Sequence, residues 1–487
     1  MFDNTRAVIL AAGRSTRFGT EKSKLLYSLC GQVMILYPLK LLERLNIPIT
    51  VVVGYQGEQI KEEIEKANIK NITYVTQKEP LGTGHAVATS QETWDRENVL
   101  ILNGDLPLLT ENIIEALVNE HANKQAEISF LSAHSLNPFG YGRVIKDKDK
   151  LAIVEEKNCT QDQRFMTLIN AGIYLVSREY LTQNIDKLKL DSVSKEFYLT
   201  DLVNLASKQG LKVYTIPVPY DNVRGVNTLE ELWAAEQIKR SELMKNWMAK
   251  GVRFELAQNI HLDYDVEIGM GSFIGTGVLL LKGTKIGKNC KVNAFTILYN
   301  TQVGDNCNIR SHSVIQDSKI GDNAEVGPFA RLRDNVELKD NIDIGNFVEI
   351  KNSKIDDSSK IKHLTYVGDA LVGKGVNIGA GTITCNYDGV NKHQTIIKDN
   401  SFIGSNNTLI APLTIGPNAY TAGGSVINKD VPEGSLAIGR ARQENKKYYT
   451  ERVKKVENEE DTQKKQYDSE QINFMGAAKD KNTQHNL

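Results

Sequence analysis

The sequence predicts two fold classes in one chain: a Rossmann-like α/β fold with a mostly parallel sheet, followed by a left-handed parallel β-helix of hexapeptide repeats. Strand and helix patterns alternate through about the first 226 residues, and aliphatic residues recur at every sixth position from residue 262 onward. The alternation is typical of a parallel sheet covered by helices. A period of six fits neither a helix nor a flat strand. Because 487 residues exceed a single core, we expect separate domains.

Residues 1–226 form the first predicted domain. Ligands of such sheets bind beyond the carboxyl ends of the strands, so the segments that follow the strands are the first candidates for a site. The apolar and helical patterns predict, in chain order, a strand at 7–12, a helix at 33–45, a strand at 49–53, a helix at 58–67, and strands at 72–75 and 99–102.

Residues 227–250 are predicted to form a connecting helix. The stretch from Asn227 to Ala249 contains neither glycine nor proline. Its apolar side is expected to include Leu229, Leu232 and Trp233.

Residues 251–442 form the second predicted domain. Three strands of about six residues close one triangular coil of about 18 residues, with the repeating aliphatic side chains pointing inward. Each coil buries its faces only against its neighbours, so the array should behave as one rod. The inward residues are Leu262, Ile268, Ile274, Leu280, Ile286, Val292 and Leu298, then Ile320, Val326, Leu332, Leu338, Ile344 and Ile350, then Ile355, Ile361, Val367, Val372, Ile378, Ile397, Ile403, Leu409 and Ile415.

Residues 443–487 form a polar tail, rich in Lys, Glu, Gln and Asn. Such a segment buries too little apolar surface to offset the entropy of ordering the chain. We therefore expect most of the tail to be disordered, apart from a short helix.

Composition excludes several classes of function. Lys and Arg number 59 and Asp and Glu number 60, so the net charge gives no reason to expect nucleic acid or a membrane as partner. The five cysteines are scattered and form neither a CxxC pair nor a Cys/His cluster, which indicates reduced thiols in a cytoplasmic protein. The first apolar run breaks at Gly13 and predicts a strand, and no apolar stretch approaches a membrane span.

A phosphate-binding loop is predicted after the first strand, where the sequence reads LAAGRSTRFG from Leu10 to Gly19. Small residues let backbone N–H groups approach a phosphate, and Arg17 and Lys24 can neutralise its charge. The loop matches neither GxGxxG nor the Walker pattern. A structural glycine turn beside surface cations would be the alternative.

Further motifs extend this pattern through the first domain and carry a resemblance. In order they are Gln77, LGTGHAV (81–87), NGDLPL (103–108), GYGRV (140–144), IVEE (153–156), NAGIY (170–174), YLTD (198–201) and GVNT (225–228). This domain resembles nucleotidyltransferases that join a sugar 1-phosphate to a nucleoside triphosphate. With the repeat domain, residues 5 to about 442 resemble the bacterial bifunctional N-acetylglucosamine-1-phosphate uridyltransferase / glucosamine-1-phosphate N-acetyltransferase family.

The resemblance implies synthesis of UDP-N-acetylglucosamine, a precursor of peptidoglycan and lipopolysaccharide, from glucosamine 1-phosphate, acetyl-CoA and UTP. In the first domain it implies a UTP site, an N-acetylglucosamine 1-phosphate site and a Mg²⁺ site. The nucleotide residues would be Leu10, Ala11, Ala12, Gly13, Arg17, Lys24, Gln77, Gly82 and Thr83, the sugar-phosphate residues Gly142, Glu155, Asn170 and Asn227, and the metal ligands Asp105 and Asn227. A single carboxylate with substrate phosphates suits Mg²⁺, although an Asp after Gly is otherwise a common turn residue.

Three residues depart from the family pattern. Ser15 stands where Gly is usual, Asn103 replaces an aromatic residue, and Gly423 replaces Ala. In addition, Lys24 lacks the usual preceding Pro. The predicted cations and metal ligands are intact.

A second site is predicted on the outside of the repeat domain. Arg333 and Lys351 each follow an inward residue and are 18 residues apart, so one coil places them above each other, roughly 4.8 Å apart. Two stacked cations require an anion or a carboxylate between them. The hypothesis is a sugar phosphate, and Glu349 is the alternative partner. His363 should also point outward, since it lies two residues past an inward position.

The resemblance makes His363 the general base that takes a proton from the amine of glucosamine 1-phosphate, a role that suits a neutral imidazole. It also implies a homotrimer with acetyl sites between neighbouring prisms. The implied sugar-phosphate residues are Arg333, Lys351, Tyr366, Asn377, Asn386, Tyr387 and Lys392, and the implied acetyl-CoA residues are Ala380, Ser405, Gly423 and Arg440.

Two other interpretations remain. The chain could be a sugar nucleotidyltransferase whose β-helix serves only assembly or regulation. That version has no need for His363, Lys351 and the NYDG loop together, and this chain has all three. It could also be a non-catalytic nucleotide-binding scaffold, for which loss of Lys24, Asp105, Asn227 or His363 would be expected, and none of these residues is lost.

Overall fold

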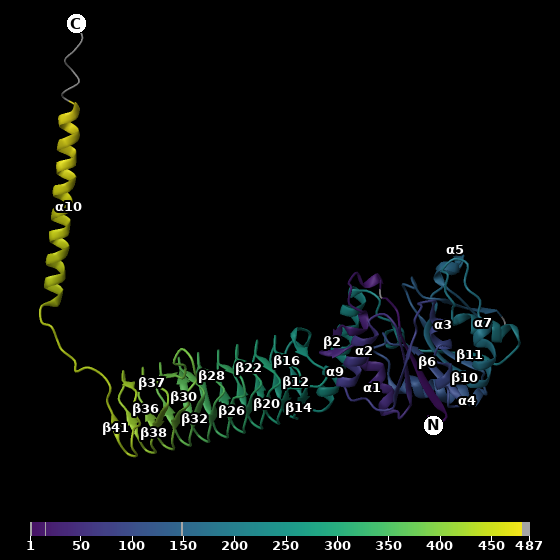
Figure 1. Cartoon of the computed structure of the whole chain (residues 1–487), viewed down its shortest axis with the longest axis horizontal. Coiled ribbons are helices and arrows are strands. Elements are labelled where there is room, and N and C mark those ends of the chain that lie inside the picture. The colour runs from purple at the N-terminus through teal and green to yellow at the C-terminus, as the bar shows by residue number, and fades with distance from the viewer. Residues whose placement is uncertain (1, 15, 148–149, 480–487) are drawn as a thin grey trace, which may run out of the picture.

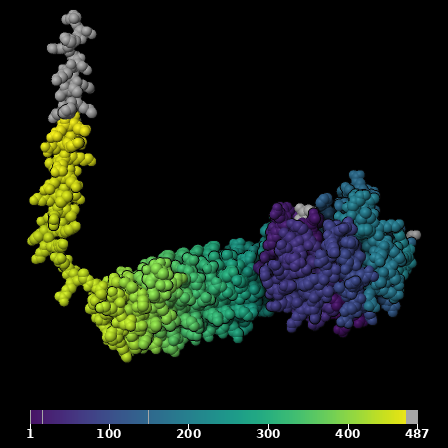
Figure 2. Space-filling view, viewed as in Figure 1, coloured from purple at the N-terminus to yellow at the C-terminus, as the bar shows by residue number. Residues whose placement is uncertain are grey.

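The computed structural model describes residues 2–14, 16–147 and 150–479 and confirms both predicted fold classes. An α/β domain lies at one end of a rod of stacked coils, and a long helix stands away from the other end (Figure 1). The space-filling view shows the same three parts, with the rod packed directly against the α/β domain (Figure 2). Ser15, one of the three departures from the family pattern, lies outside the described residues.

The α/β domain is built on one nine-stranded mixed sheet, whose main order is β11-β7-β10-β6-β1-β4-β5. Four of its eight strand pairs are parallel. The other four are antiparallel: β10 with β6, β7 and β8, and β8 with β9. The strands are β1 (Thr5–Ala11), β4 (Ile49–Val53), β5 (Ile72–Thr76), β6 (Asn98–Asn103), β7 (Ile128–His134), β8 (Arg143–Asp147), β9 (Lys150–Val154), β10 (Leu168–Ser177) and β11 (Val213–Pro217), with a small hairpin of β2 (Ser28–Leu29) and β3 (Gln32–Val33).

Helices pack on both faces of this sheet, and each face has its own apolar core. The apolar strands β1, β4 and β6 are almost fully buried, as expected for parallel strands covered on both sides. The helices are α1 (Leu36–Arg44), α2 (Gly57–Lys66), α3 (Thr83–Ala88), α4 (Glu111–Lys124), α5 (Gln161–Arg164), α6 (Arg178–Asn184), α7 (Thr200–Lys208) and α8 (Tyr220–Val223).

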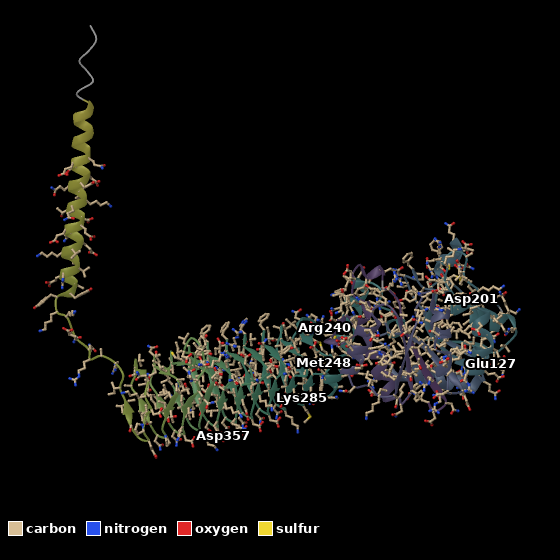
Figure 3. All side chains as sticks on the ribbon, in the orientation of Figure 1. Glu127, Asp201, Arg240, Met248, Lys285 and Asp357 are labelled. Atoms are coloured by element: carbon tan, nitrogen blue, oxygen red, sulfur yellow. The ribbon has the colours of Figure 1, made fainter. Side chains whose placement is uncertain are left out.

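Helix α9 (Leu229–Ala249) joins the domain to the rod. It begins at a capping box in which Thr228 and Glu231 satisfy each other's backbone N–H groups. Ala235 packs into the α/β domain, whereas Met244 packs into the core of the rod (Figure 3 shows the junction beside Arg240 and Met248). The expected apolar side was wrong for Leu229 and Trp233, which are exposed. Because α9 packs against a different domain at each end, it buries residues on more than one of its faces. It therefore has no single apolar stripe in its sequence.

The rod consists of three parallel sheets of 11, 10 and nine strands, which are its walls. The first runs from β12 (Arg253–Phe254) to β41 (Leu436–Ala437), the second from β13 (His261–Leu262) to β40 (Val426–Ile427), and the third from β14 (Glu267–Ile268) to β38 (Leu413–Ile415). Every predicted inward residue belongs to one continuous buried core. The hexapeptide period therefore identified the core correctly.

One coil of the core was missed in sequence. Val303, Ile309 and Ile315 are buried and lie between the first two runs of the repeat. They keep the spacing of six among themselves, but a one-residue deletion precedes and follows them. Many corners of the coils are left-handed turns occupied by asparagine, which adopts this conformation more readily than most residues.

The tail, for which the sequence predicts disorder apart from a short helix, contains one long helix. Helix α10 spans Tyr449–Lys479, and the residues that follow it lie outside the described part of the chain. The segment contains many good helix formers and no proline, which explains the helix although its residues from 449 to 471 are all exposed. No described helix is both long enough and apolar enough to cross a membrane.

A tight contact in the rod gives a stability prediction. Gly345, in β27 (Asp343–Asn346), faces the backbone of β30 (Lys360–His363), and a Cβ atom there would overlap the carbonyl oxygen of Lys362. We expect Gly345→Ala to lower the free energy of unfolding by about 1–3 kcal/mol in urea titrations, the usual cost of overpacking. Gly423→Ala is the control, because its Cβ would lie 3.4 Å from the carbonyl oxygen of Ser405, an ordinary contact. Equal stability of both variants would contradict the prediction.

Candidate active sites

A cavity of about 470 Å³ lies beyond the carboxyl ends of β1 and β6, where the fold predicts a site. Gly13 faces open space, so the loop backbone is accessible there. Gly82 has a φ of 101°, and a Cβ atom would collide with Phe197. Its backbone conformation therefore requires glycine. All nine predicted nucleotide residues line this cavity: Leu10, Ala11, Ala12, Gly13, Arg17, Lys24, Gln77, Gly82 and Thr83.

The two cations of the loop meet at Asn227. Its side-chain oxygen accepts hydrogen bonds from Lys24 Nζ at 2.8 Å and from Arg17 Nη2 at 2.9 Å. Lys24 also forms an ion pair with Asp105, and both side chains are largely buried. Residues far apart in sequence thus converge on one charged cluster at the floor of the cavity.

The other oxygen of Asp105 has no partner. Oδ1 is buried and accepts no hydrogen bond from any described residue. Gly225 lies beside it, and a Cβ atom at Gly225 would approach both Asn227 and Asp105. A buried carboxylate oxygen without a donor is costly. This position therefore suits a cation, and its oxygen donors are of the type that Mg²⁺ prefers. Among the described residues, no group of three or more His, Cys, Asp or Glu side chains is placed to hold a metal ion.

A second cavity of about 280 Å³ adjoins the first and shares Arg17, Thr83, Asp105 and Asn227 with it. It contains the remaining predicted sugar-phosphate residues of this domain, which are Gly142, Glu155 and Asn170. Asn103, one of the departures from the family pattern, lines both cavities. Two ligands bound in these cavities would therefore meet at the charged cluster.

Polar groups in the second cavity are held by neighbours that the sequence did not indicate. Burial raises the pKa of Glu155, although a hydrogen bond from Thr200 at 2.8 Å partly opposes this. Asn170 donates to the hydroxyl of Tyr174 at 2.5 Å, across the irregular part of strand β10. These contacts fix acceptors and donors at the positions that face the cavity.

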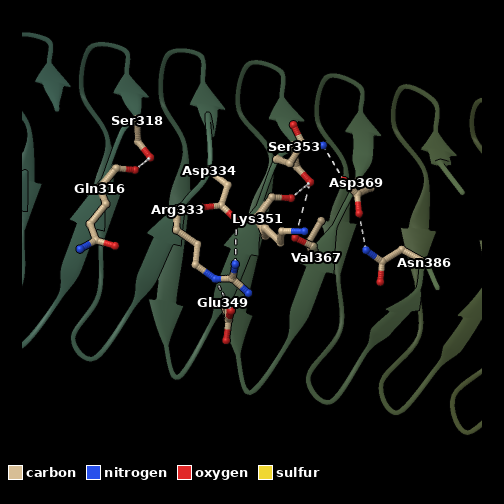
Figure 4. Close-up of polar contacts among 11 residues, drawn as sticks. Gln316, Ser318, Arg333, Asp334, Glu349, Lys351, Ser353, Val367, Asp369 and Asn386 are labelled. Atoms are coloured by element: carbon tan, nitrogen blue, oxygen red, sulfur yellow. Dashed lines mark hydrogen bonds and ion pairs between the residues drawn. The ribbon is translucent and has the colours of Figure 1, made fainter. Parts of the chain in front are cut away.

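On the rod, Arg333 and Lys351 lie in register on adjacent strands, β25 (Arg331–Arg333) and β28 (Glu349–Lys351), as the 18-residue spacing predicts. The Arg333 guanidinium donates to Glu349 and to Asp334, each at 2.8 Å (Figure 4). Arg333 therefore pairs with Glu349, the carboxylate that the sequence offered as the alternative to a sugar phosphate. Lys351 lies on the next coil, toward Asp369 and Asn386 (Figure 4).

The loop between β34 (Ile383–Cys385) and β35 (Thr395–Ile397) brings a second cation, Lys392, to Lys351. Lys392 pairs with Tyr387 across the loop, and the neighbouring Lys351 ammonium lowers the pKa of Lys392. Asn386 donates a hydrogen bond to Asp369, which anchors the base of the loop beside Lys351. Two neighbouring ammonium groups form a place where an anion would be stabilised.

His363 is exposed at the end of β30, in register with Asn346 on β27. Its Nδ1 lies 2.9 Å from the side-chain oxygen of Asn346. Because an amide oxygen only accepts hydrogen bonds, Nδ1 must carry the proton, and the lone pair of a neutral ring is then on Nε2. Asn346 was not predicted from the sequence, although its 17-residue separation from His363, one coil, could have indicated it.

The residues implied for acetyl-CoA continue the column that begins with Asn346 and His363. Backbone hydrogen bonds link the coils along this column: the N–H of Gly381 donates to the carbonyl of His363, that of Asn406 to Ala380, and that of Gly424 to Ser405. Ala380, Ser405 and Gly423 therefore follow His363 on successive coils. Beyond His363 this edge carries only small side chains. Arg440 is exposed past the last strand and is not tied to the column by a side-chain hydrogen bond or ion pair in the described structure.

The structure does not bring all implied sugar residues together within one chain. Tyr366 lies on the same wall as Lys351, with its ring over Gly368. Asn377 lies on a different wall, in β33 (Asn377–Ile378) next to β30. The outward residues of the rod are thus divided between two faces that meet at His363.

Comparisons with known proteins support both halves of this description. A family model for the MobA-like NTP transferase domain matches residues 7–169, and one for the bacterial transferase hexapeptide (six repeats) matches residues 283–316. The bifunctional protein GlmU of Alkaliphilus metalliredigens is 39% identical over 451 residues, which are 92% of this chain and 98% of that protein. This chain belongs to the GlmU family. GlmU of Geotalea daltonii is 41% identical over 447 residues, 90% of this chain and 97% of that protein.

The two alignments cover 98% and 97% of the GlmU proteins, but they cover 92% and 90% of this chain. This chain is therefore longer than these GlmU relatives.

Proposed function

We propose that the α/β domain transfers a uridylyl group from UTP to N-acetylglucosamine 1-phosphate, and that the rod transfers an acetyl group from acetyl-CoA to glucosamine 1-phosphate. Together the two reactions of this bifunctional enzyme make UDP-N-acetylglucosamine. The observation that carries the proposal is the convergence of all nine predicted nucleotide residues on one cavity, in a chain whose rod also carries an outward His363 and the neighbouring cations Lys351 and Lys392.

In the first site, a phosphate oxygen of the sugar phosphate attacks the α-phosphorus of UTP, and pyrophosphate leaves. Such a step needs alignment and charge stabilisation rather than a protein nucleophile. Arg17 and Lys24 neutralise the triphosphate, and Glu155 and Asn170 orient the sugar in the adjoining cavity. The shared wall of the two cavities supports this arrangement, since it would place the two reacting groups next to each other.

Asp105 and Asn227 would hold Mg²⁺ in this site. The unpartnered oxygen of Asp105 and the adjacent amide oxygen of Asn227 support this assignment. When bound, the metal would supply positive charge to the phosphates. Lys24 would then release Asp105 and contact the triphosphate instead.

In the second site, His363 Nε2 takes a proton from the amine of glucosamine 1-phosphate as the nitrogen attacks the thioester carbonyl. Coenzyme A leaves as the thiol, and the amide product carries the acetyl group. Arg333, Lys351 and Lys392 bind the sugar phosphate, and the lowered pKa of Lys392 supports an anion at this place. Tyr366, Asn377, Asn386 and Tyr387 orient the sugar.

The edge beyond His363 would bind acetyl-CoA. Ala380, Ser405 and Gly423 are small and follow one another on successive coils, so an extended thioester arm can lie along them with its carbonyl near His363. Arg440 would contact the coenzyme from the end of the rod. The absence of a side chain at Gly423 leaves additional room at this edge.

The active assembly is proposed to be a homotrimer. The implied sugar residues of one chain lie on two walls, so a complete site would need a neighbouring prism. The corner between these walls also carries an exposed stack of Phe295, His312, Phe329 and Phe347, with ring centroids 4.9–5.3 Å apart. Such a patch is typical of an interface. A monomer with full acetyl transfer in sedimentation experiments would overturn this proposal.

The experiment that tests the function is a mass-spectrometric assay with glucosamine 1-phosphate, acetyl-CoA, UTP and Mg²⁺, in which each is omitted in turn. We expect N-acetylglucosamine 1-phosphate without UTP, and UDP-N-acetylglucosamine only with all four. Uridylyl transfer without any acetyl transfer would instead indicate a single-function enzyme with a structural β-helix. The five free thiols support a cytoplasmic location, where these substrates would be available.

Asn346 is proposed as a positioning residue for His363. We expect Asn346→Ala to lower kcat of acetyl transfer by about 10- to 100-fold with little change in KM, because loss of an orienting hydrogen bond misplaces the base. Asn346→Asp should keep most of the activity, since its carboxylate also accepts from Nδ1. Equal losses in both variants would show that the acceptor at this position does not matter.

A further inference from the structure

Helix α10 contributes no residue to either of the two proposed reactions. It is 31 residues long and stands away from the rod (Figure 1, Figure 2). Every residue from 440 to 471 is exposed, including Tyr449, Val453, Val456 and Tyr467. A helix that packs on nothing is only marginally stable in water. Its order therefore needs a partner that covers one face.

The exposed apolar residues of α10 follow a heptad pattern. Tyr449, Val453, Val456 and Tyr467 fall on positions d, a, d and a of one register, with spacings of four and three that continue through Glu460 and Gln463. Alternating spacings of this kind place side chains on one seam of a coiled coil. The seam is apolar from Tyr449 to Val456, polar at Glu460 and Gln463, and ends with Tyr467 followed by the acidic Glu470 at the next d position.

The flanking charges in the same register favour parallel pairing. In a parallel coiled coil, each g position faces the following e position of the neighbouring helix. Here Arg452 at g would face Glu457 at e, and Glu459 at g would face Lys464 at e. The third pair, Gln466 with Gln471, is neutral. Both charged pairs are therefore attractive when identical helices run side by side in the same direction.

We propose that α10 forms a parallel coiled coil with the same helix of the other copies in the assembly. This inference rests on the proposed trimer, in which parallel prisms would release the three tails from the same end. The polar layer at Glu460 and Gln463 makes the coil weak by itself. Tethering to a common rod raises the effective concentration of the helices to about the millimolar range, which compensates for this weakness.

Cross-linking of the full chain tests the proposal. Val456→Cys places a thiol in the seam, and Asn458→Cys places one at the outward f position two residues away. With a short bismaleimide, we expect Val456→Cys to give a covalent dimer on a denaturing gel, since each thiol reacts once, whereas Asn458→Cys and the unmodified protein should give little. The native cysteines are mostly buried and serve as the background in all three samples.

Sedimentation of the same samples separates this inference from the proposed trimer. A trimer in which Val456→Cys and Asn458→Cys cross-link equally, or not at all, overturns the coiled coil and leaves the proposed function intact. A monomer overturns both.

Exchange of one charged pair tests the direction of the helices. Arg452→Glu, added to the Val456→Cys chain, should reduce cross-linking through the introduced thiol, because it places two acidic residues opposite each other. Adding Glu457→Arg should restore the cross-linking. Failure of this combined variant to recover would contradict the parallel pairing.

Discussion

His363→Ala is expected to abolish acetyl transfer while uridylyl transfer continues at its normal rate. A general base that is positioned on the reacting amine contributes about 10²- to 10⁴-fold to the rate, and no other described imidazole lies in this column of the rod. The loss should appear in kcat, because the phosphate of the sugar is bound by other residues. Thiol release from acetyl-CoA measures the first reaction, and pyrophosphate release the second.

His134→Ala is the matched control for this experiment. His134 is also exposed, but it lies in the other domain and contacts Thr167. Its replacement should leave both reactions unchanged. If His363→Ala lowered both reactions together, the two-site description would be wrong, because the variant would then act through the fold or the assembly.

The opposite pattern is expected for Lys24→Ala and for Asp105→Asn. Lys24→Ala removes a cation that would neutralise the triphosphate, and Asp105→Asn removes the carboxylate that would hold Mg²⁺ beside the phosphates. Removal of one such group costs about 10²- to 10³-fold in rate. Uridylyl transfer should therefore fall by at least this factor, while acetyl transfer in the same preparation stays normal and reports an intact rod.

Lys22→Ala provides the control for Lys24. Lys22 is two residues away, and its ammonium lies over the ring of Tyr27, 5.1 Å from the centroid, rather than in the cavity. A near-normal rate of UDP-sugar synthesis in Lys24→Ala or Asp105→Asn would refute the assignment of this cluster. A loss in Lys22→Ala of the same size would show that general positive charge, and not the cavity, is responsible.

The rod could be predicted from sequence in unusual detail because its geometry is set locally. Each coil has about the same number of residues, so the position of a residue in the repeat decides whether it points inward and which residue lies above it. Arg333 and Lys351 were therefore placed correctly, as were the inward residues of the core. In the first domain, the motifs around Gly13 and Asp105 predicted the cavity because strand ends in such sheets converge.

The contacts that depend on distant segments could not be predicted. The pairing of Asn227 with both Arg17 and Lys24 joins residues that lie 210 and 203 positions apart. Helix α9 buries Ala235 and Met244 against two different partners, so its amphipathic pattern is weak. Helix α10 was also not predicted at its full length. A polar composition indicates that a segment has no core of its own, but it does not show how charged side chains pair along a helix.

The position of α9 between the two cores has a consequence for the path of the intermediate. Because one helix packs into both the α/β domain and the rod, the two proposed catalytic centres are held apart on a common frame, with several coils between the junction and β30, the strand that carries His363 (Figure 1). Acetylated sugar phosphate formed on the rod must therefore be released and diffuse through bulk solvent before it is recaptured, and substrate channelling along a single chain is not expected.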